Sequence, residues 1–181
     1  PFPHLAGVGL ALKLTQAVYN HMGLPWDKRL LQLAALGTIT DVAPLVGENR
    51  YIVAAGLRSL STDPRPGLKE LLRLGGLDGE EVDTETISFV LGPRLNAPGR
   101  LEHAITSYNL LCASSLEEAQ PLAHEMERLN RERQELTRKA MDRANQQLED
   151  GRPSDLLMLL WDEEYTPGIV GLVASRLVEE H

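Results

Sequence analysis

The sequence predicts a mainly α-helical chain with one short buried strand near its C-terminal end. Apolar residues recur at helical spacing along most of its 181 residues. One such pattern, beginning at Ser115, continues for roughly 30 residues, which is long for a small protein. The exception is LLMLLW at 156–161, a continuous apolar run that indicates a strand of a parallel or mixed sheet.

The composition is that of a globular chain, with 43% hydrophobic, 24% charged and 4% aromatic residues. There is no apolar run of about 18 residues and no export signal, so we expect no membrane span and a cytoplasmic location. The lone Cys112 excludes an internal disulfide and a CxxC metal site. The net charge of −8 argues against binding nucleic acid through overall charge, although it allows a local basic surface.

The N-terminal part is expected to form short helices separated by Gly and Pro. We place them at 5–22, 28–36, 51–60 and 67–74, then in a short helix capped by Thr84 or Thr86 and ending at Leu91, and at 102–111. The first is apolar almost all round in its first half, which is typical of a buried helix, and Gly7 and Gly9 indicate close packing. The segments 38–49 and 92–100 are expected to be loops.

The long helix begins with Ser115 and Glu118 at the spacing of a capping box. At 1.5 Å per residue it would span about 45 Å, which is typical of a helix that connects two bodies. Its arginines alternate with acidic residues, as on a solvated face with ion pairs between turns. A final helix is expected at 169–180. Because the chain starts at Pro1 without Met and stops within this helix, we expect an excerpt of a longer protein.

Asp41 is the first candidate for chemistry, because it stands among apolar neighbours directly after a helix that we expect to be buried. Burying a carboxylate is costly unless it is paired or bound to a metal, and Mg²⁺ and Mn²⁺ prefer such oxygen ligands. The alternative is that Asp41 only bonds the backbone of its own loop.

Two further segments carry groups that suit phosphate. In GPRLNAPGR, the planar donors Arg94, Asn96 and Arg100 stand on a backbone constrained by Gly and Pro, and Arg can bind phosphate through two parallel bonds. The alternative is a structural loop whose arginines pair with the acidic stretch 77–85. In PGIVGLVASR, glycines open a helix and Ser175 and Arg176 add donors, although such a helix can also simply pack closely on a sheet.

In this order, five segments resemble the RecJ family of the DHH phosphoesterase superfamily. They are LAGVGLALKL, ALGTITDVAPLVGENR, LGPRLNAPGRL, LNRERQ and PGIVGLVASRLVEE. The resemblance implies an α/β parent protein of which this excerpt is mainly α. Residues 1–114 would be the C-terminal part of the DHH catalytic domain, 115–150 a connector helix, and 151–181 the first strand and helix of the DHH-associated domain.

The resemblance also implies a 5′→3′ exonuclease of single-stranded DNA with a two-metal Mn²⁺ or Mg²⁺ site, acting in DNA repair and recombination. Asp41 would be a catalytic metal ligand. Arg94, Asn96 and Arg100 would lie along the DNA path, and Ser175 and Arg176 would hold the 5′-terminal phosphate. Besides single-stranded DNA, a single-strand-binding protein and a helicase are the partners that the family implies.

The chain departs from the family in what it contains. The family's Asp-x-Asp motif, its second-motif Asp and the Asp-His-His triplet are not in this sequence, so we expect the chain alone to have no nuclease activity. Thr166 stands where we would expect His. Two other functions stay open: a DHH phosphodiesterase acting on short oligonucleotides or cyclic dinucleotides, whose Gly-Gly-His-like signature is absent here, and a non-catalytic helical interaction module.

Overall fold

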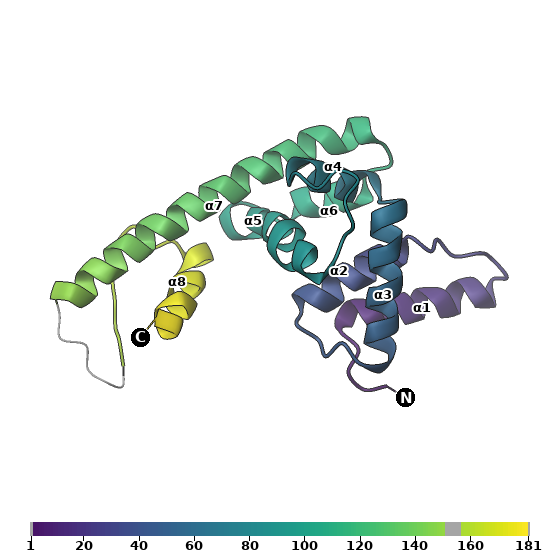
Figure 1. Ribbon diagram of the computed structural model, residues 1–181, viewed down its shortest axis with the longest axis horizontal. Helices are drawn as coiled ribbons and strands as arrows, with labels where there is room; N and C mark the ends of the chain where they lie inside the picture. Colours follow the sequence, from purple (N-terminus) through teal and green to yellow (C-terminus); the bar gives the residue numbers. More distant parts are fainter. Residues whose placement is uncertain (1, 151–156, 181) are drawn as a thin grey trace.

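The computed structural model describes residues 2–150 and 157–180, and most of these are helical (Figure 1). The elements are α1 (Gly7–His21), α2 (Leu30–Thr40), α3 (Gly47–Thr62), α4 (Pro66–Leu74), the π-helical η1 (Thr86–Leu91), α5 (Gly92–Leu101), α6 (Ile105–Cys112), α7 (Leu116–Asp150) and α8 (Pro167–Glu180). The mainly helical fold is therefore as predicted. Among the described residues, no helix combines the length and the apolar character needed to cross a membrane.

Helix α7 is 35 residues long and runs along one side of the molecule (Figure 1). Its start has the predicted cap: the Ser115 hydroxyl accepts a hydrogen bond from the Glu118 N–H at 3.2 Å. The Glu118 carboxylate in turn accepts one from the Ser114 N–H at 2.9 Å. These bonds satisfy backbone donors at the start of the helix, and the bonds from Ser114 to the carboxylate lower the pKa of Glu118.

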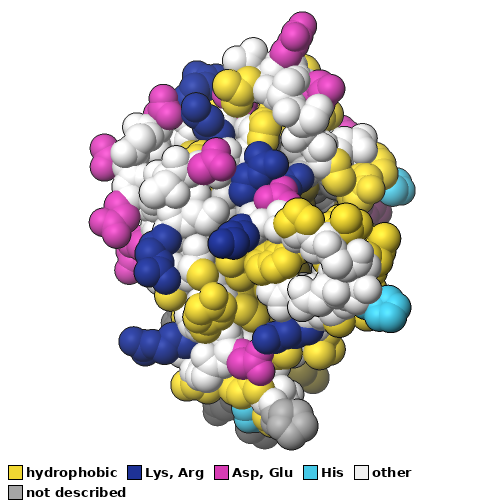
Figure 2. Space-filling model, turned by 90° about the vertical axis from the view of Figure 1, so that its right-hand side faces the viewer, with side chains coloured by type: hydrophobic (Ala, Val, Ile, Leu, Met, Phe, Trp, Pro, Cys, Tyr) yellow, Lys and Arg dark blue, Asp and Glu magenta, His cyan; other side chains and the backbone are white. Residues whose placement is uncertain are grey.

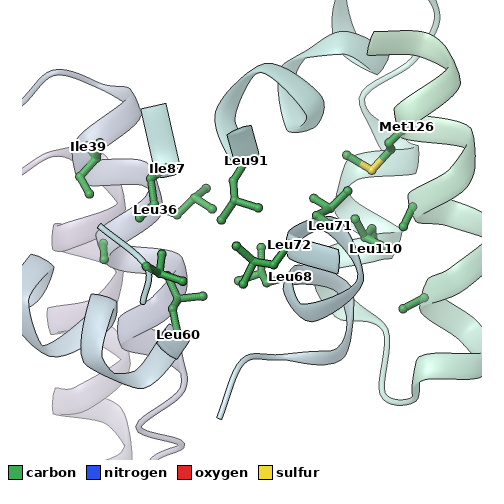
Figure 3. Packing of buried hydrophobic residues seen from close by; sticks show 14 of the residues in the cluster. Leu36, Ile39, Leu60, Leu68, Leu71, Leu72, Ile87, Leu91, Leu110 and Met126 are labelled. Atoms are coloured by element: carbon green, nitrogen blue, oxygen red, sulfur yellow. The ribbon is translucent and has the colours of Figure 1, made fainter. Parts of the chain in front are cut away.

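The two halves of α7 contribute to different apolar cores. The first half adds Ala119, Ala123 and Met126 to a cluster formed by α2, α3, α4, η1 and α6, in which leucine and isoleucine side chains point toward one another (Figure 3). The second half packs against α8 in a smaller cluster: Ala140, Met141, Ala144, Ile169, Val173 and Leu177. Since removing apolar surface from water is the main driving force of folding, α7 is fixed to a separate apolar body at each half.

A buried amide joins α2 to the turn between α3 and α4. Gln32 is fully buried. Its amide nitrogen donates to the Ser59 hydroxyl at 2.8 Å and to the Asp63 carbonyl at 2.7 Å, and its oxygen accepts from the Arg65 N–H at 2.9 Å. A buried polar side chain that finds all these partners specifies one arrangement of the elements around it.

The expectation that the first helix is buried all round is wrong. Gly9 and Leu12 of α1 are buried, but Leu10 and Leu14 are 60% and 68% exposed. Gly7 has no neighbour that a Cβ would meet within 4 Å, so close packing does not explain it. Figure 2, which views the end of the molecule formed by α1–α3, shows hydrophobic side chains on the surface between scattered basic ones.

The predicted strand at 156–161 is also wrong for the part that can be examined, since Leu156 lies outside the described residues. Leu157 forms a single bridge and the residues from Met158 to Trp161 have no regular structure. Met158 and Leu160 are partly buried, whereas Leu159 is 85% exposed. The segment alternates like a strand, but a strand also needs a neighbouring strand to satisfy its backbone, and the described residues provide no such ladder.

The short helix before α5 is capped by Asp83 and not by Thr84 or Thr86. The Asp83 carboxylate accepts hydrogen bonds from the Thr86 N–H at 2.7 Å and the Thr86 hydroxyl at 2.8 Å. These bonds lower the pKa of Asp83. The prediction failed because the cap is a carboxylate, Asp83, and the residue three positions later is Thr86, which bonds back to it through its hydroxyl. This arrangement is a variant of the Ser-x-x-Glu pattern.

We expect Gln32→Met to lower the free energy of unfolding by about 1–3 kcal/mol, because it keeps the volume but leaves the Arg65 N–H without its partner. Urea unfolding followed by circular dichroism measures the loss. Gln134→Met, on the exposed side of α7, is the matched control and should stay within about 0.5 kcal/mol of wild type. Equal effects of the two substitutions would contradict the structural role of the buried amide.

Candidate nucleic-acid interface

Helix α2 continues past Gly37 to Thr40, so the segment 38–49 is not wholly a loop as predicted; α3 likewise begins early, at Gly47. Asp41 is the C-cap of α2. The turn after it has the hydrogen bonds of a Schellman motif: the Val42 N–H donates to the Ile39 carbonyl at 3.0 Å and the Ala43 N–H to the Thr38 carbonyl at 3.2 Å.

The residue in the left-handed position of this turn is Val42, with φ 53°, where glycine is usual. A β-branched residue in this region costs about 1–2 kcal/mol. Such strain persists where the surrounding structure fixes the backbone, and it is concentrated at functional sites. Here the buried Asn49 helps to fix the turn, because its amide donates to the Pro44 carbonyl at 3.0 Å and to the His4 carbonyl at 2.7 Å.

The carboxylate of Asp41 is exposed, so the expected burial is wrong for this chain. Its side chain makes no hydrogen bond or ion pair with any other described residue. The alternative, that it bonds the backbone of its own loop, is therefore not observed either. The strained turn thus presents a free carboxylate at the end of α2.

The segment GPRLNAPGR is the helix α5, not an irregular loop as predicted. Pro93 is at its first turn, where a missing N–H costs little, and Pro98 is tolerated inside it. Helical geometry then decides which side chains act together: Asn96 and Arg100, four residues apart, share a face, while Arg94 lies two residues from Asn96 and therefore points elsewhere.

Two adjoining pockets join the predicted residues into one groove. The first, of about 370 Å³, is lined by Asp41, Thr40 and Asn96 together with α1 and Gly37. The second, of about 290 Å³, is also lined by Thr40 and Asn96 and continues to Arg100, to Arg133 of α7 and to Leu172 of α8. Because the two pockets share Thr40 and Asn96, we call them together the Asp41–Arg133 groove.

Two glycines allow the helices around the groove to approach one another. A Cβ on Gly92 would lie 3.1 Å from Thr40, so this residue lets α5 begin beside the end of α2. A Cβ on Gly168 would lie 2.0 Å from the Arg100 carbonyl oxygen, a distance that no side chain can adopt. The Arg100 guanidinium also donates to the Gly168 carbonyl at 3.1 Å, which fixes the start of α8 against the end of α5.

Arg94 lies in an ion pair between helices. Its Nε donates to the Glu127 carboxylate at 2.7 Å, and Nη1 donates to the Val90 carbonyl at 2.9 Å. The Arg94 and Glu127 side chains are only 14% and 13% exposed. Arg94 is not among the residues that line the Asp41–Arg133 groove, and its contact is with α7 and not, as the structural alternative had it, with the stretch 77–85.

Ser175 and Arg176 are exposed on α8. Both share a helix face with Leu172, which lines the groove. Burial lowers the pKa of Arg133, and the positive charges of Arg100 and Arg176 lower it further. Arg176 forms no ion pair with a described carboxylate.

Arg133 is the groove residue that sequence reasoning missed, because it was grouped with the paired arginines of α7. Three of those form the predicted ion pairs between turns, namely Arg128, Arg131 and Arg138, whereas Arg143 pairs with Asp162 and Glu164 outside α7. Only helical phase could have separated Arg133 from them: Leu129, four residues away, and Met126 and Ala140, each seven residues away, are all buried.

The described residues include no group of three His, Cys, Asp or Glu side chains that could hold a metal ion. Asp41, with a free carboxylate beside the Asn96 amide, fits one coordination position for a hard cation such as Mn²⁺ or Mg²⁺. A site with three such ligands would need residues from outside the described part of the chain.

Comparison with known proteins gives relatives over nearly the whole chain. No protein-family model matches it. It is 43% identical over 179 residues to the RecJ exonuclease of Bacillus subtilis, which covers 99% of this chain and 22% of that protein. The RecJ of Thermus thermophilus is 38% identical (96% of this chain, 25% of that protein), and that of Escherichia coli 34% identical (99% and 34%).

Solved structures of relatives have the same fold as this chain. The crystal structure of Thermus thermophilus RecJ with Mn²⁺ matches 97% of this chain and 26% of that one, with a TM-score of 0.86 and 36% identity. Its complex with Mg²⁺ gives a TM-score of 0.85.

All three relatives are named as single-stranded-DNA-specific exonucleases, and this is the class of protein that the chain resembles. Within that class all three are RecJ proteins, which this chain resembles over nearly its whole length while it spans between 22% and 34% of theirs.

We expect Arg94→Met to lower the free energy of unfolding by about 3 kcal/mol, because it leaves Glu127 with only the exposed Arg131 as partner. Urea unfolding measures the loss, and a double-mutant cycle with Glu127→Gln should give a coupling of at least about 1 kcal/mol. Arg58→Met, an exposed residue on α3, is the control and should be near neutral. Additive losses would contradict the ion-pair role.

Proposed function

We propose that this chain is part of a RecJ-type enzyme that degrades single-stranded DNA in the 5′→3′ direction, and that it supplies one metal ligand and part of the DNA path. The single observation that carries the proposal is the Asp41–Arg133 groove, which joins a free carboxylate to an amide and arginines. A DNA backbone needs both kinds of group: cations and amide donors for its phosphates, and metal ligands at the reacting phosphate.

Asp41 would hold one metal ion of a two-metal Mn²⁺ or Mg²⁺ site. Bound metal in such sites polarises the phosphate and makes water a better nucleophile. The contribution of this chain is to fix the carboxylate: the C-cap of α2 and the strained Val42 turn determine where Asp41 points. Crystal structures of relatives with Mn²⁺ and with Mg²⁺ support the choice of ion.

The DNA path would run from Asp41 past Asn96 and Arg100 toward α8, where Ser175 and Arg176 would contact the 5′-terminal phosphate. Asn96 and Arg100 donate from one face of α5, at the spacing of one helical turn. Arg94 was predicted on the same path. We now propose that it acts indirectly, by fixing α5 to α7 through Glu127.

We further propose the division into the end of a DHH domain (1–114), a connector (115–150) and the start of the associated domain (151–181). The two apolar clusters on α7 support it, although the first turns of α7 contribute to the first cluster. Because Asp41 is one ligand and a two-metal site needs several, the chain alone would have no nuclease activity.

The names of the relatives favour the exonuclease over a cyclic-dinucleotide phosphodiesterase or a non-catalytic helical module. A cytoplasmic location, and partnership with a single-strand-binding protein and a helicase, stay predictions from the family resemblance.

In the full-length protein we expect Asp41→Asn to reduce Mn²⁺-dependent release of nucleotides from single-stranded DNA. The loss should exceed the roughly 10–100-fold that removal of an outer-shell partner typically costs. Thermal stability should hardly change, because the carboxylate is exposed and unbonded.

The matched control is Asp78→Asn, an exposed turn residue that lines neither pocket of the groove, and it should keep the wild-type rate. A wild-type rate for Asp41→Asn would show that Asp41 is not a metal ligand.

A further inference from the structure

Val42 combines two features that do not stabilise the described part of the chain. Its backbone lies in the left-handed region, with φ 53°, which is unfavourable for a β-branched residue. Its side chain is 87% exposed, so the strained turn buries almost none of it. Gly or Asn would suit this backbone better. Because strain of this kind is concentrated at ligand sites, the exposed Val42 side chain points to a contact with a ligand.

The pocket of about 290 Å³ that Val42 lines has both apolar and polar lining residues. The apolar ones are Ile39, Val42, Pro93 and Leu172. The polar side chains are those of Thr40, Ser88, Asn96, Arg100 and Arg133. The Arg133 guanidinium is held by Asn130, because its Nη2 donates to the Asn130 side chain at 2.9 Å. A DNA phosphate uses only the polar groups, so phosphate contacts leave the apolar lining unexplained.

Phe89 adds an exposed aromatic ring next to this apolar lining. The π-helical turn η1 directs Ile87 and Leu91 into the first apolar core, where both are fully buried (Figure 3), and leaves Phe89 75% exposed. The pocket is lined by its neighbour Ser88 and by Pro93, about one helical turn further along. π-Helical turns are rare and are frequently found at functional sites. An aromatic ring is thus presented beside the pocket on an element that the core holds in place.

A nucleobase of a single strand fits this combination of groups. Bases of single strands stack on aromatic and apolar side chains, while donors from the protein hold the sugar and phosphate. A base in a duplex is already paired and stacked between its neighbours, so it must be unstacked before it can make such a contact. Stacking also accepts any sequence, because every base has a π face.

We propose that Val42 and Phe89, together with Pro93 and Leu172, form a subsite for the base of the 5′-terminal nucleotide, the one that is released. This inference rests on the proposed function, in which the scissile phosphate lies at Asp41 and the 5′-terminal phosphate at α8. The nucleotide between these two phosphates occupies the pocket that Val42 lines. Its base meets the apolar lining, and its phosphates meet the polar groups.

The first test measures binding of a 5′-phosphorylated oligothymidylate to the full-length protein, with the metal chelated to prevent cleavage. A second strand is identical except that its 5′-terminal nucleotide is abasic. Wild type should bind the abasic strand roughly tenfold more weakly, because the stacking of one base is lost. Phe89→Ala should bind the intact strand roughly tenfold more weakly than wild type does, and it should no longer distinguish the two strands.

Tyr51→Ala is the matched control. Tyr51 is an aromatic residue of α3 that is 67% exposed and lines neither pocket of the groove, so its variant should distinguish the two strands as wild type does. The proposal is overturned if wild type binds both strands equally, or if Phe89→Ala still distinguishes them to the same extent as wild type.

The second test uses Val42→Asn in the full-length protein, because Asn tolerates the left-handed backbone while the apolar side chain is removed. This variant should unfold at the same temperature as wild type or at a higher one. In the nuclease assay it should raise KM for the intact strand severalfold and leave KM for the abasic strand nearly unchanged. An unchanged KM for the intact strand, or an equal rise for both strands, would overturn the contact of Val42 with the base. A lower unfolding temperature would overturn it as well, since it would show that other parts of the protein cover Val42.

The binding test separates the subsite from the function. A wild-type protein that binds the intact and the abasic strand equally tightly would overturn the subsite and leave the exonuclease proposal standing. A wild-type protein that binds neither strand would remove the DNA function, and the subsite with it.

Discussion

The groove depends on the contact between Gly168 and the backbone of Arg100. Without a side chain at Gly168, the start of α8 lies directly on the end of α5, where a Cβ would be 2.0 Å from a carbonyl oxygen. This contact brings residues about 70 positions apart in sequence to the same place, an arrangement that packing and not local propensity must maintain. The two cores on α7 supply that packing, since one holds α4, α6 and η1 and the other holds α8.

Charge is distributed unevenly around this contact. The chain has a net charge of −8, yet most of the arginines on α7 are neutralised by carboxylates three or four residues away. The acidic excess therefore does not reach Arg100, Arg133 and Arg176. A protein that is acidic overall can bind a polyanion in this way, because screening in water confines each surface charge to a range of about 10 Å.

Sequence patterns predicted the long helix and its Ser115 cap, because both depend on local spacing. They failed where tertiary contacts determine the secondary structure. GPRLNAPGR has the composition of a loop, yet α5 is helical and buries Ala97 and Pro98. With this segment predicted as a loop, Arg94 and Asn96 could not be assigned to different faces of a helix. The apolar run at 156–161 has the composition of a buried strand, but whether such a run becomes a strand depends on neighbours that no pattern within it can specify.

The central claim is that the Asp41–Arg133 groove carries a DNA strand from Arg133 to Asp41. A crystal structure of the full-length protein with Mn²⁺ and a 5′-phosphorylated single strand tests this most directly. The account predicts a phosphate oxygen within hydrogen-bond distance of the Arg133 guanidinium and a metal-bound phosphate at Asp41, with Asn96 and Arg100 contacting the strand between them. A strand that passes along another face, with Arg133 bonded only to Asn130, would contradict it.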